Sequence, residues 1–375
     1  MSSAPLLIDL ASHPERSAEY EALVGAHFPA GHPPSRPLPP REEFPLLLAS
    51  NEASQRLALL EGDRLVATTA YRLFEFPGQL RVAALGLVVT HPDFRGRGHA
   101  AKLLAEGESR ARAQGAALAA LWSDLLNFYT KQGYLVGGTE LQWTLDAEGY
   151  SLLRARLRAE VPATTSYRVR PLANFDEIAA LGEGLGPRRE SRHYDAFIAL
   201  ADTELFVAED ASGRAKAWAF RGKGRDLRDT LHEIRGATSA VAPLLAHFAK
   251  TGEALRVQVP AASPLREELT HWLGAPERGP LAFFKVLSTA KLLDWVARER
   301  LLGASLRLRA LEGEGFEMGD DRRTIFRSTD PGHLIQLLMG PWRPDELEGL
   351  PPEIGQALSQ APLPLPLYFW GLDSV

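Results

Sequence analysis

An apolar strand that runs into a glycine turn and then into an amphipathic helix limits the possible folds of this chain more than any other feature. Residues 85–90 are apolar, residues 91–98 include Gly96 and Gly98, and apolar residues recur at helical spacing over 98–114. Backbone N–H groups stay unpaired at such a helix start, where the helix dipole also favours anions. The segment predicts a site for a phosphate group. A purely structural turn with solvated arginines is the alternative.

The flanking residues predict a mixed sheet. A helix at 15–28 and a proline-rich connection at 29–42 precede the strands. The predicted strands lie at 56–60, 64–70, 80–89 and 116–122. Hairpin-linked strands followed by a strand–helix–strand unit give a sheet with one parallel crossover. The fold class expected is therefore α/β (α+β).

The order of elements recurs in the second half of the chain. Its predicted strands and helix lie at 204–209, 215–220, 230–234, 237–250 (the helix) and 254–259. We therefore expect a duplicated domain. A further region follows, with helices at 289–301 and 330–340. Residues 362–375 end the chain with an apolar, aromatic segment that we expect to pack against protein.

Composition excludes several classes of function. The formal net charge of −5 argues against a nucleic-acid partner, because phosphate recognition usually needs a basic face. The absence of cysteine excludes a disulfide framework, a thiolate zinc site and a cysteine nucleophile. Residues 1–8 lack the basic region of a signal peptide, and no stretch could span a bilayer. A cytoplasmic protein with no membrane partner is expected.

The glycine turn and a second motif together resemble the GNAT superfamily of acetyltransferases. Arg95, Gly98 and Ala100 match the cofactor motif Arg/Gln-x-x-Gly-x-Gly/Ala of that superfamily. After the next strand, residues 127–134 read Asn-Phe-Tyr-Thr-Lys-Gln-Gly-Tyr and match its later signature. The resemblance implies acetyl-CoA as co-substrate, direct transfer of the acetyl group to an amine, and no metal.

The same resemblance assigns residues to the cofactor. Backbone amides of the loop would hold the CoA pyrophosphate; the loop residues are Arg95, Gly96, Arg97, Gly98, His99 and Ala100. The strand edge at Leu87, Val88 and Val89 would bind the pantetheine arm. Tyr129 would donate a proton to the departing thiolate, and Asn127 would help to position the cofactor.

The general base is not evident from the sequence. Many members of the superfamily carry a Glu on the strand before the loop, but residues 80–90 contain no carboxylate. His91, Glu75 and Asp124 are possible substitutes, and the spacing distinguishes none of them.

The domain order resembles the enhanced-intracellular-survival acetyltransferase family. It implies a catalytic GNAT domain (1–148), a degenerate GNAT domain (149–284) and a sterol-carrier-like domain (285–375). In the second copy, residues 235–239 lack the second glycine. Members of that family form hexamers, so a homo-oligomer is implied. Their terminal carboxylate acts as the base, which here would be that of Val375.

The function expected is N-acetyltransfer to a primary amine of a small molecule that is aminoglycoside-like, polyamine-like or lysine-type. A non-catalytic acyl-CoA-binding or scaffold protein is an alternative of a different class. A tandem GNAT synthase that acylates an amino-sugar thiol precursor, as in mycothiol synthesis, is another.

Overall fold

The structure is a computed structural model that separates into two compact units. Unit 1 contains the chain up to Gly138 together with Pro280–Leu367, and unit 2 contains Thr139–Gly279 with Tyr368–Asp373. The structure describes residues 4–28, 39–48, 54–160, 167–179, 181, 186–190, 194, 197, 200, 203–223, 227–248, 255–302, 306–320, 323–340, 352–359, 361 and 363–373. Within these ranges no helix has the length and apolar character needed to cross a bilayer.

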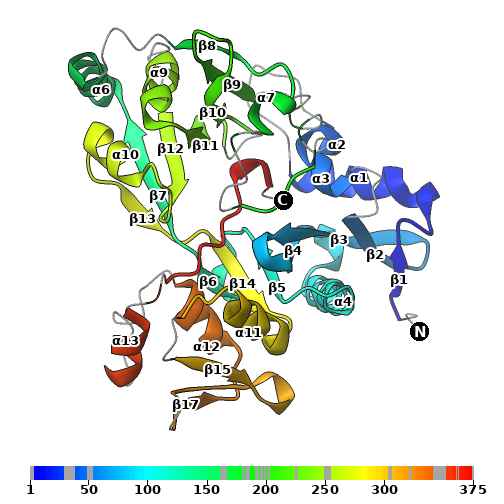
Figure 1. Ribbon diagram of the computed structural model, residues 1–375. Coiled ribbons are helices and arrows are strands. Elements are labelled where there is room, and N and C mark those ends of the chain that lie inside the picture. The colour runs from blue at the N-terminus through cyan, green and yellow to red at the C-terminus, as the bar shows by residue number, and fades with distance from the viewer. Residues whose placement is uncertain are drawn as a thin grey trace. The chain divides into compact units, whose positions relative to one another are not determined.

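Unit 1 is built on a seven-stranded mixed sheet with the order β1-β2-β3-β4-β5-β14-β6 (Figure 1). Its strands are β1 (Leu6–Asp9), β2 (Ser54–Glu61), β3 (Arg64–Phe76), β4 (Leu80–Thr90), β5 (Leu118–Leu121), β6 (Leu135–Gly137) and β14 (Ala282–Val286). Its helices in the first part of the chain are α1 (Ser17–His27), α2 (Pro40–Glu43), α3 (Pro45–Leu48), α4 (His99–Ala113) and α5 (Leu126–Lys131). The predicted hairpin, the strand before the glycine turn and the helix after it are thus confirmed. Most of the proline-rich connection lies outside the described residues.

Helices α1 and α4 pack on opposite faces of this sheet. The alternation of side chains along β3 decides which residue meets which helix. Ala70 joins the cluster that contains Tyr20 of α1, whereas Tyr71 joins the cluster that contains Leu104 of α4. The apolar stripe predicted for residues 98–114 is therefore the face of α4 that the sheet buries.

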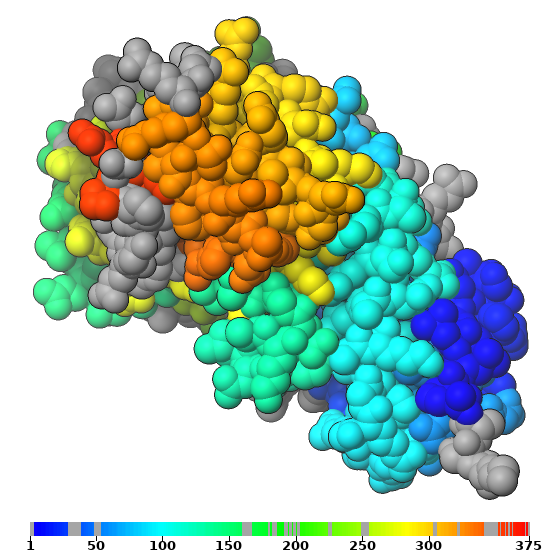
Figure 2. Space-filling view, turned by 90° about the horizontal axis from the view of Figure 1, so that it is seen from below, coloured from blue at the N-terminus to red at the C-terminus, as the bar shows by residue number. Residues whose placement is uncertain are grey.

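The last part of unit 1 contains a smaller antiparallel sheet, β15-β16-β17. Its strands are β15 (Arg307–Ala310), β16 (Phe316–Gly319) and β17 (Thr324–Ser328), and the helices of this part of the chain are α11 (Thr289–Arg298), α12 (Gly332–Leu334) and α13 (Pro352–Ser359). Figure 2 shows the residues of this sheet in orange beside those of α11 in yellow. The helix predicted over 330–340 differs from the expectation, because Ile335–Met339 form a π-helix. Gly340 ends it with a positive φ of 72°.

Unit 2 repeats the sheet of unit 1 strand for strand. Its order is β8-β9-β10-β11-β12-β7-β13 when read in the same direction. The strands are β7 (Glu140–Leu145), β8 (Arg168–Pro171), β9 (Glu204–Glu209), β10 (Ala215–Arg221), β11 (Thr230–Gly236), β12 (Leu255–Pro260) and β13 (Glu277–Gly279). The helices are α6 (Ala147–Glu160), α7 (Asp176–Ala179), α9 (Thr238–Phe248) and α10 (Arg266–Leu273). The predicted duplication of a mixed sheet is confirmed.

Each sheet contains one strand that, in the sequence, directly follows the last strand of the other copy. Strand β14 follows the second copy along the chain but pairs with β5 and β6. Conversely, β7 follows β6 but pairs with β12 and β13. Both insertions occupy the sixth position of a sheet, so the two repeats exchange equivalent strands. The compact units therefore differ from the predicted boundaries at 148/149 and 284/285, and the functional division into three domains stays a prediction.

The aromatic end of the chain is docked, as its composition predicts. Tyr368, Phe369 and Trp370 are buried, and residues Gly371–Asp373 form the short helix η7. In unit 2 the hydroxyl of Tyr368 donates to Oε2 of Glu140 on β7 at 2.8 Å. Burial raises the pKa of Glu140 to about 7, although the bond from Tyr368 acts in the opposite direction.

The raised pKa of Glu140 predicts a loss of stability between pH 4.5 and 7. In this range the folded chain keeps a proton that the unfolded chain releases, so the free energy of unfolding falls as the pH rises. The Glu140→Gln variant cannot ionise. The free energy of unfolding of the variant minus that of the native protein should therefore increase by about 3 kcal/mol from pH 4.5 to pH 8. Urea unfolding at several pH values measures this, with exposed Glu148→Gln as the control. Parallel curves for the native protein and Glu140→Gln would contradict the prediction.

Candidate active site

Strands β4 and β5 pair at one end and separate at the other. Their parallel ladder joins only Val82, Ala83 and Ala84 to residues 118–120. Strand β4 continues to Thr90, whereas β5 ends at Leu121. The backbone edge at residues 87–89 therefore has no ladder partner on β5. This is the edge that the sequence assigns to the pantetheine arm.

A β-bulge reshapes β4 where the two strands separate. Thr68 pairs with Val89 and Ala70 pairs with Gly86, so two residues of β4 oppose Thr69 alone. Leu87 takes the left-handed conformation with φ of 53°, which is uncommon for a residue with a large side chain. The bulge reverses the alternation of side chains. Leu85 lies in the cluster of α4, whereas Leu87 lies in the cluster of α1.

The hydroxyl of Thr68 holds this bulge by donating to the carbonyl of Leu87 at 2.9 Å. Thr68 is fully buried, so the Thr68→Val variant leaves that carbonyl without its partner. We expect it to lower the free energy of unfolding by about 1–3 kcal/mol in urea titrations. The same change at Thr144, which is exposed on β7, serves as control. Equal stability of the two variants would contradict this role of Thr68.

The loop between β4 and α4 exposes a row of unpaired backbone donors. Gly96 and Gly98 have φ of 77° and 79°, and a Cβ on either would meet no atom within 4 Å. The first backbone bond of the helix runs from the N–H of Lys102 to the carbonyl of Gly98. No described residue accepts a hydrogen bond from the N–H groups of residues 96–101. The helix start is thus open to an anion.

Side chains of the loop bind a carboxylate of the hairpin β2–β3. Arg97 donates to Oε2 of Glu61 at 3.0 Å and lies over the ring of Phe94, 4.8 Å from its centre. His99 is buried, with Nε2 3.0 Å from Oε1 of the same Glu61. The carboxylate of Glu61 thereby ties the loop to the end of β2. Sequence reasoning missed this residue, because only tertiary contacts bring residues 61 and 97 together.

Two further cations border the loop. Arg95 is exposed, and its Nε donates to the carbonyl of Thr90 at 3.3 Å. Arg64, at the start of β3, places Nη2 2.7 Å from Nε2 of His91 and lies 5.2 Å from the centre of the Phe94 ring. Arg64 was not singled out from the sequence. Together with the open amides, Arg95 and Arg64 make this end of the sheet favourable for a pyrophosphate.

Tyr129 lies on α5 in the core beside β5. Its ring is 6.0 Å from that of Phe283 on β14 and 5.9 Å from that of Tyr134. Burial raises the pKa of the Tyr129 phenol, and a hydrogen bond with Ser123 acts in the opposite direction. The phenol is therefore protonated at neutral pH, which a proton donor requires.

The other aromatic and amide residues of the second motif take different places. Tyr134 is fully buried, and its hydroxyl donates to Oε1 of Glu108 at 2.9 Å. Lys285 binds the second oxygen of that carboxylate at 2.6 Å. Tyr134 is thus a core residue, as the sequence suggested. Asn127 is exposed on α5.

None of the proposed bases stands out in the structure. His91 lies at the loop beside Arg64, Asp124 is exposed, and Glu75 on β3 is 4.0 Å from Arg81. Val375, and with it the terminal carboxylate, lies outside the described residues. Among the described residues, no group of His, Asp and Glu could hold a metal ion.

The matching position of unit 2 has no comparable loop. Only Ala237 separates β11 from α9, and its N–H donates to the carbonyl of Lys216 at 3.0 Å. The backbone of Gly236 packs directly against Ala217 of β10. At the helix start, the hydroxyl of Thr238 donates to the carboxylate of Glu268 at 3.3 Å. A protein carboxylate therefore stands near this helix start.

Comparison with known proteins agrees with this geometry. The family model for the acetyltransferase (GNAT) domain matches residues 36–137. A GCN5-related N-acetyltransferase from Anabaena variabilis is 12% identical with a TM-score of 0.68, covering 99% of this chain and 100% of that one. A probable N-acyltransferase from Enterococcus faecalis is 16% identical with a TM-score of 0.67, covering 96% and 97%.

Eis1 from Mycobacterium abscessus is 13% identical, with a TM-score of 0.61 and coverage of 99% of both chains. At these identities the structural likeness establishes the fold. Comparison with curated proteins finds no match. The family model and the shared fold, together with the open helix start beside the separated strands, show that the chain contains an acetyltransferase (GNAT) domain at residues 36–137.

Proposed function

We propose that this enzyme transfers an acetyl group from acetyl-CoA directly to a primary amine of a small molecule. The observation that carries the proposal is a row of N–H groups at the start of α4 for which the described residues supply no acceptor. It lies next to the edge of β4 that has no ladder partner on β5. The amides of Arg95–Ala100 would bind the pyrophosphate, and residues 87–89 would bind the pantetheine arm. Asn127 would lie beside the cofactor.

The chemistry requires two proton transfers. The neutral amine attacks the thioester carbonyl, a C–N bond forms and the C–S bond breaks. Tyr129 then gives its proton to the departing thiolate. A protonated phenol is available for this step because burial raises its pKa. The amine loses one proton to a base, so the products are the amide and the free thiol.

For the base we propose the terminal carboxylate of Val375, on the strength of the resemblance to the enhanced-intracellular-survival family. Removal of Ser374 and Val375 should lower kcat by about 100-fold, the order expected of a general base. The affinity for acetyl-CoA should stay near normal in calorimetry. Unchanged turnover would exclude this base.

The same resemblance supports the remaining parts of the proposal. They are an acceptor of the aminoglycoside, polyamine or lysine type, a sterol-carrier-like region at 285–375 and a homo-oligomer. The absence of cysteine favours a cytoplasmic protein, and the missing second glycine at residues 235–239 favours a second copy that binds no cofactor. The missing loop of unit 2 favours a single cofactor site per chain.

Thiol release from acetyl-CoA with a panel of amines tests the activity. Spermidine, kanamycin and lysine represent the acceptor classes, and reactions without amine are the control. Amine-dependent release with at least one class is the expected result. Binding of acetyl-CoA without amine-dependent release would favour a non-catalytic acyl-CoA-binding protein.

A further inference from the structure

Unit 1 contains a cavity of about 580 Å³ between helix α11 and the first residues of β4. Gly115 and Ala117, which precede β5, complete its wall. Its volume is typical of sites for small molecules. The glycine loop follows the other end of β4, about 30 Å away along this strand of 11 residues. The cavity is therefore separate from the proposed cofactor loop.

Hydrogen bonds fix α11 to the segment that leads into β4. Trp295 is buried and donates from Nε1 to the carbonyl of Pro77 at 3.0 Å. Nη2 of Arg298 donates to the carbonyl of Gly78 at 3.3 Å. Both carbonyls belong to the short helix η2 (Pro77–Gln79), which continues directly into β4. The two walls are thus held together by the protein, so the cavity is preformed.

The lining combines an apolar patch with charged side chains. Leu80, Ala117 and Trp295 supply the apolar part, and each is at most 4% exposed. The contribution of α11 lies mostly on one face, at positions i, i+3, i+4 and i+7; these residues are Lys291, Asp294, Trp295 and Arg298. Charged groups therefore border apolar surface, as they do in many sites for small molecules.

Two cations of the lining converge on Gly115. A Cβ atom there would lie 3.4 Å from Nη1 of Arg81 and 3.6 Å from Nζ of Lys291, so these nitrogens are no more than about 7 Å apart. Like charges at such a distance repel each other. Nη1 of Arg81 donates to the carbonyl of Gln114 at 2.9 Å, and Nε lies 4.0 Å from Glu75. Nζ of Lys291 has no partner among the described residues.

The carboxylate in the lining does not neutralise these cations. Asp294 lies about one turn from both Lys291 and Arg298 along α11. Within the described part of the chain, however, no ion pair joins it to either residue. The cations of Arg81, Lys291 and Arg298 outnumber the carboxylates even when Glu75 beside Arg81 is counted. The cavity therefore favours an anion.

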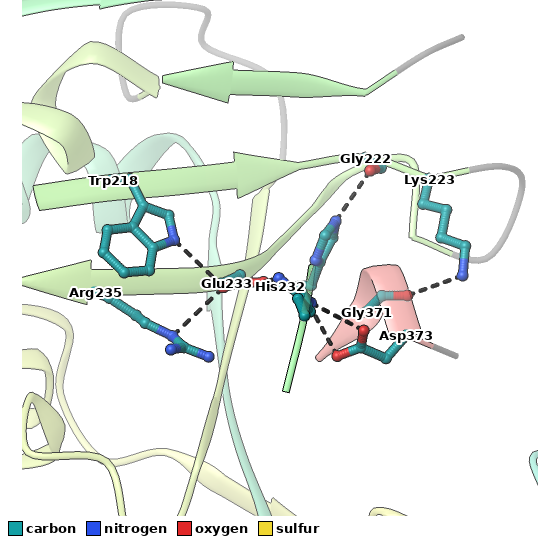
Figure 3. Close-up of polar contacts among 9 residues, drawn as sticks. Trp218, Gly222, Lys223, His232, Glu233, Arg235, Gly371 and Asp373 are labelled. Atoms are coloured by element: carbon teal, nitrogen blue, oxygen red, sulfur yellow. Dashed lines mark hydrogen bonds and ion pairs between the residues drawn. The ribbon is translucent and has the colours of Figure 1, made fainter. Parts of the chain in front are cut away.

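The buried charges of unit 2 show the opposite arrangement, in which the protein supplies the partners. Arg189 binds Asp373 at 2.9 Å and Glu233 at 2.8 Å. Arg235 lies 3.4 Å from Glu233 (Figure 3). Two carboxylates thus accompany two cations, as buried charges require. The cations of the cavity are exposed instead, so a ligand can reach them.

We propose that this cavity binds a small organic anion that carries a carboxylate or phosphate group on an apolar ring or short chain. The acidic group binds between Arg81 and Lys291, where it relieves their repulsion and accepts charge-assisted hydrogen bonds. The apolar part covers Leu80, Ala117 and Trp295. This site is additional to the proposed acetyl transfer and does not depend on it.

Calorimetric titration of the full chain with phenyl phosphate and benzoate tests the site. At least one probe should bind with a Kd below about 1 mM, both with and without saturating acetyl-CoA. The tighter of the two probes identifies the acidic group as phosphate or carboxylate. Inorganic phosphate lacks the ring and benzyl alcohol lacks the charge. Each should bind at least about tenfold more weakly than the better probe, because it uses only half of the lining.

Two substitutions in the cavity should act in opposite directions. Lys291→Met removes a cation without breaking a described bond of its side chain, and it should weaken binding of the better probe by at least about tenfold. Asp294→Asn removes the carboxylate of the lining and should strengthen binding by about threefold. Partial unfolding cannot produce both effects. Arg266→Met, which removes an exposed cation from α10 in unit 2, is the control and should leave binding unchanged.

Three results would overturn the proposal. The first is that neither probe binds at a concentration of about 10 mM. The second is equal affinity of the native protein and the Lys291→Met variant for the better probe. The third is displacement of the probes by acetyl-CoA, which would assign their binding to the cofactor site. None of these results affects the proposed acetyl transfer, because thiol release measures that activity separately.

Discussion

The Tyr129→Phe variant should lose about 100- to 1000-fold in kcat, the order of a missing general acid. The thiolate would then leave without a proton from the enzyme. The ring of Tyr129 packs against Phe283 and Tyr134, and phenylalanine preserves these contacts. The Kd for acetyl-CoA should therefore change by no more than about twofold. Stopped-flow thiol release and calorimetry measure the two quantities.

Tyr134→Phe is the matched control, because this residue is also a buried tyrosine of the same cluster. Its hydroxyl donates to Glu108, and the proposed mechanism gives it no role. The variant should lose stability by about 1–3 kcal/mol, since Glu108 loses a buried partner, and retain near-normal kcat. A similar fall in kcat for both variants would show that the cluster supports the fold and that Tyr129 has no special role.

The Gly96→Asp variant should weaken acetyl-CoA binding by about 100-fold, equivalent to the loss of roughly two charge-assisted hydrogen bonds. Gly96 lies in the row of open amides, and a Cβ there meets no protein atom within 4 Å. The new carboxylate would therefore stand where the pyrophosphate is proposed to bind. Isothermal titration with acetyl-CoA at fixed ionic strength measures the change.

Two controls separate charge from backbone strain. Gly96→Asn makes nearly the same change in shape without charge and should weaken binding far less, because asparagine tolerates positive φ. Gly213→Asp carries the charge to a turn of unit 2 that has the same φ of 77° and equally open surroundings. It should leave binding unaltered. Equal affinities for Gly96→Asp and Gly213→Asp would place the pyrophosphate elsewhere.

Local patterns were sufficient to predict the elements that form this site. Apolar runs bounded by turn residues marked β2, β3 and β4, whose strands are buried along most of their length, and helical spacing marked α4, which is buried on one face. The conformations of Gly96 and Gly98 also follow from residue type, since glycine enters the left-handed region without strain. The helix at 330–340 was less predictable. Residues 335–339 within it form a π-helix, for which periodicity of 3.6 gives no signal.

The sequence by itself determined that this chain contains two copies of one mixed sheet, only the first of which has a glycine loop at the start of its helix. Tertiary structure alone decided that the copies exchange β7 and β14, since the pattern of a buried strand does not specify which sheet buries it. It likewise decided the bulge at Leu87 and the meeting of Arg189 with Asp373. Buried charges need partners, and the chain supplies that partner from a segment 184 residues away.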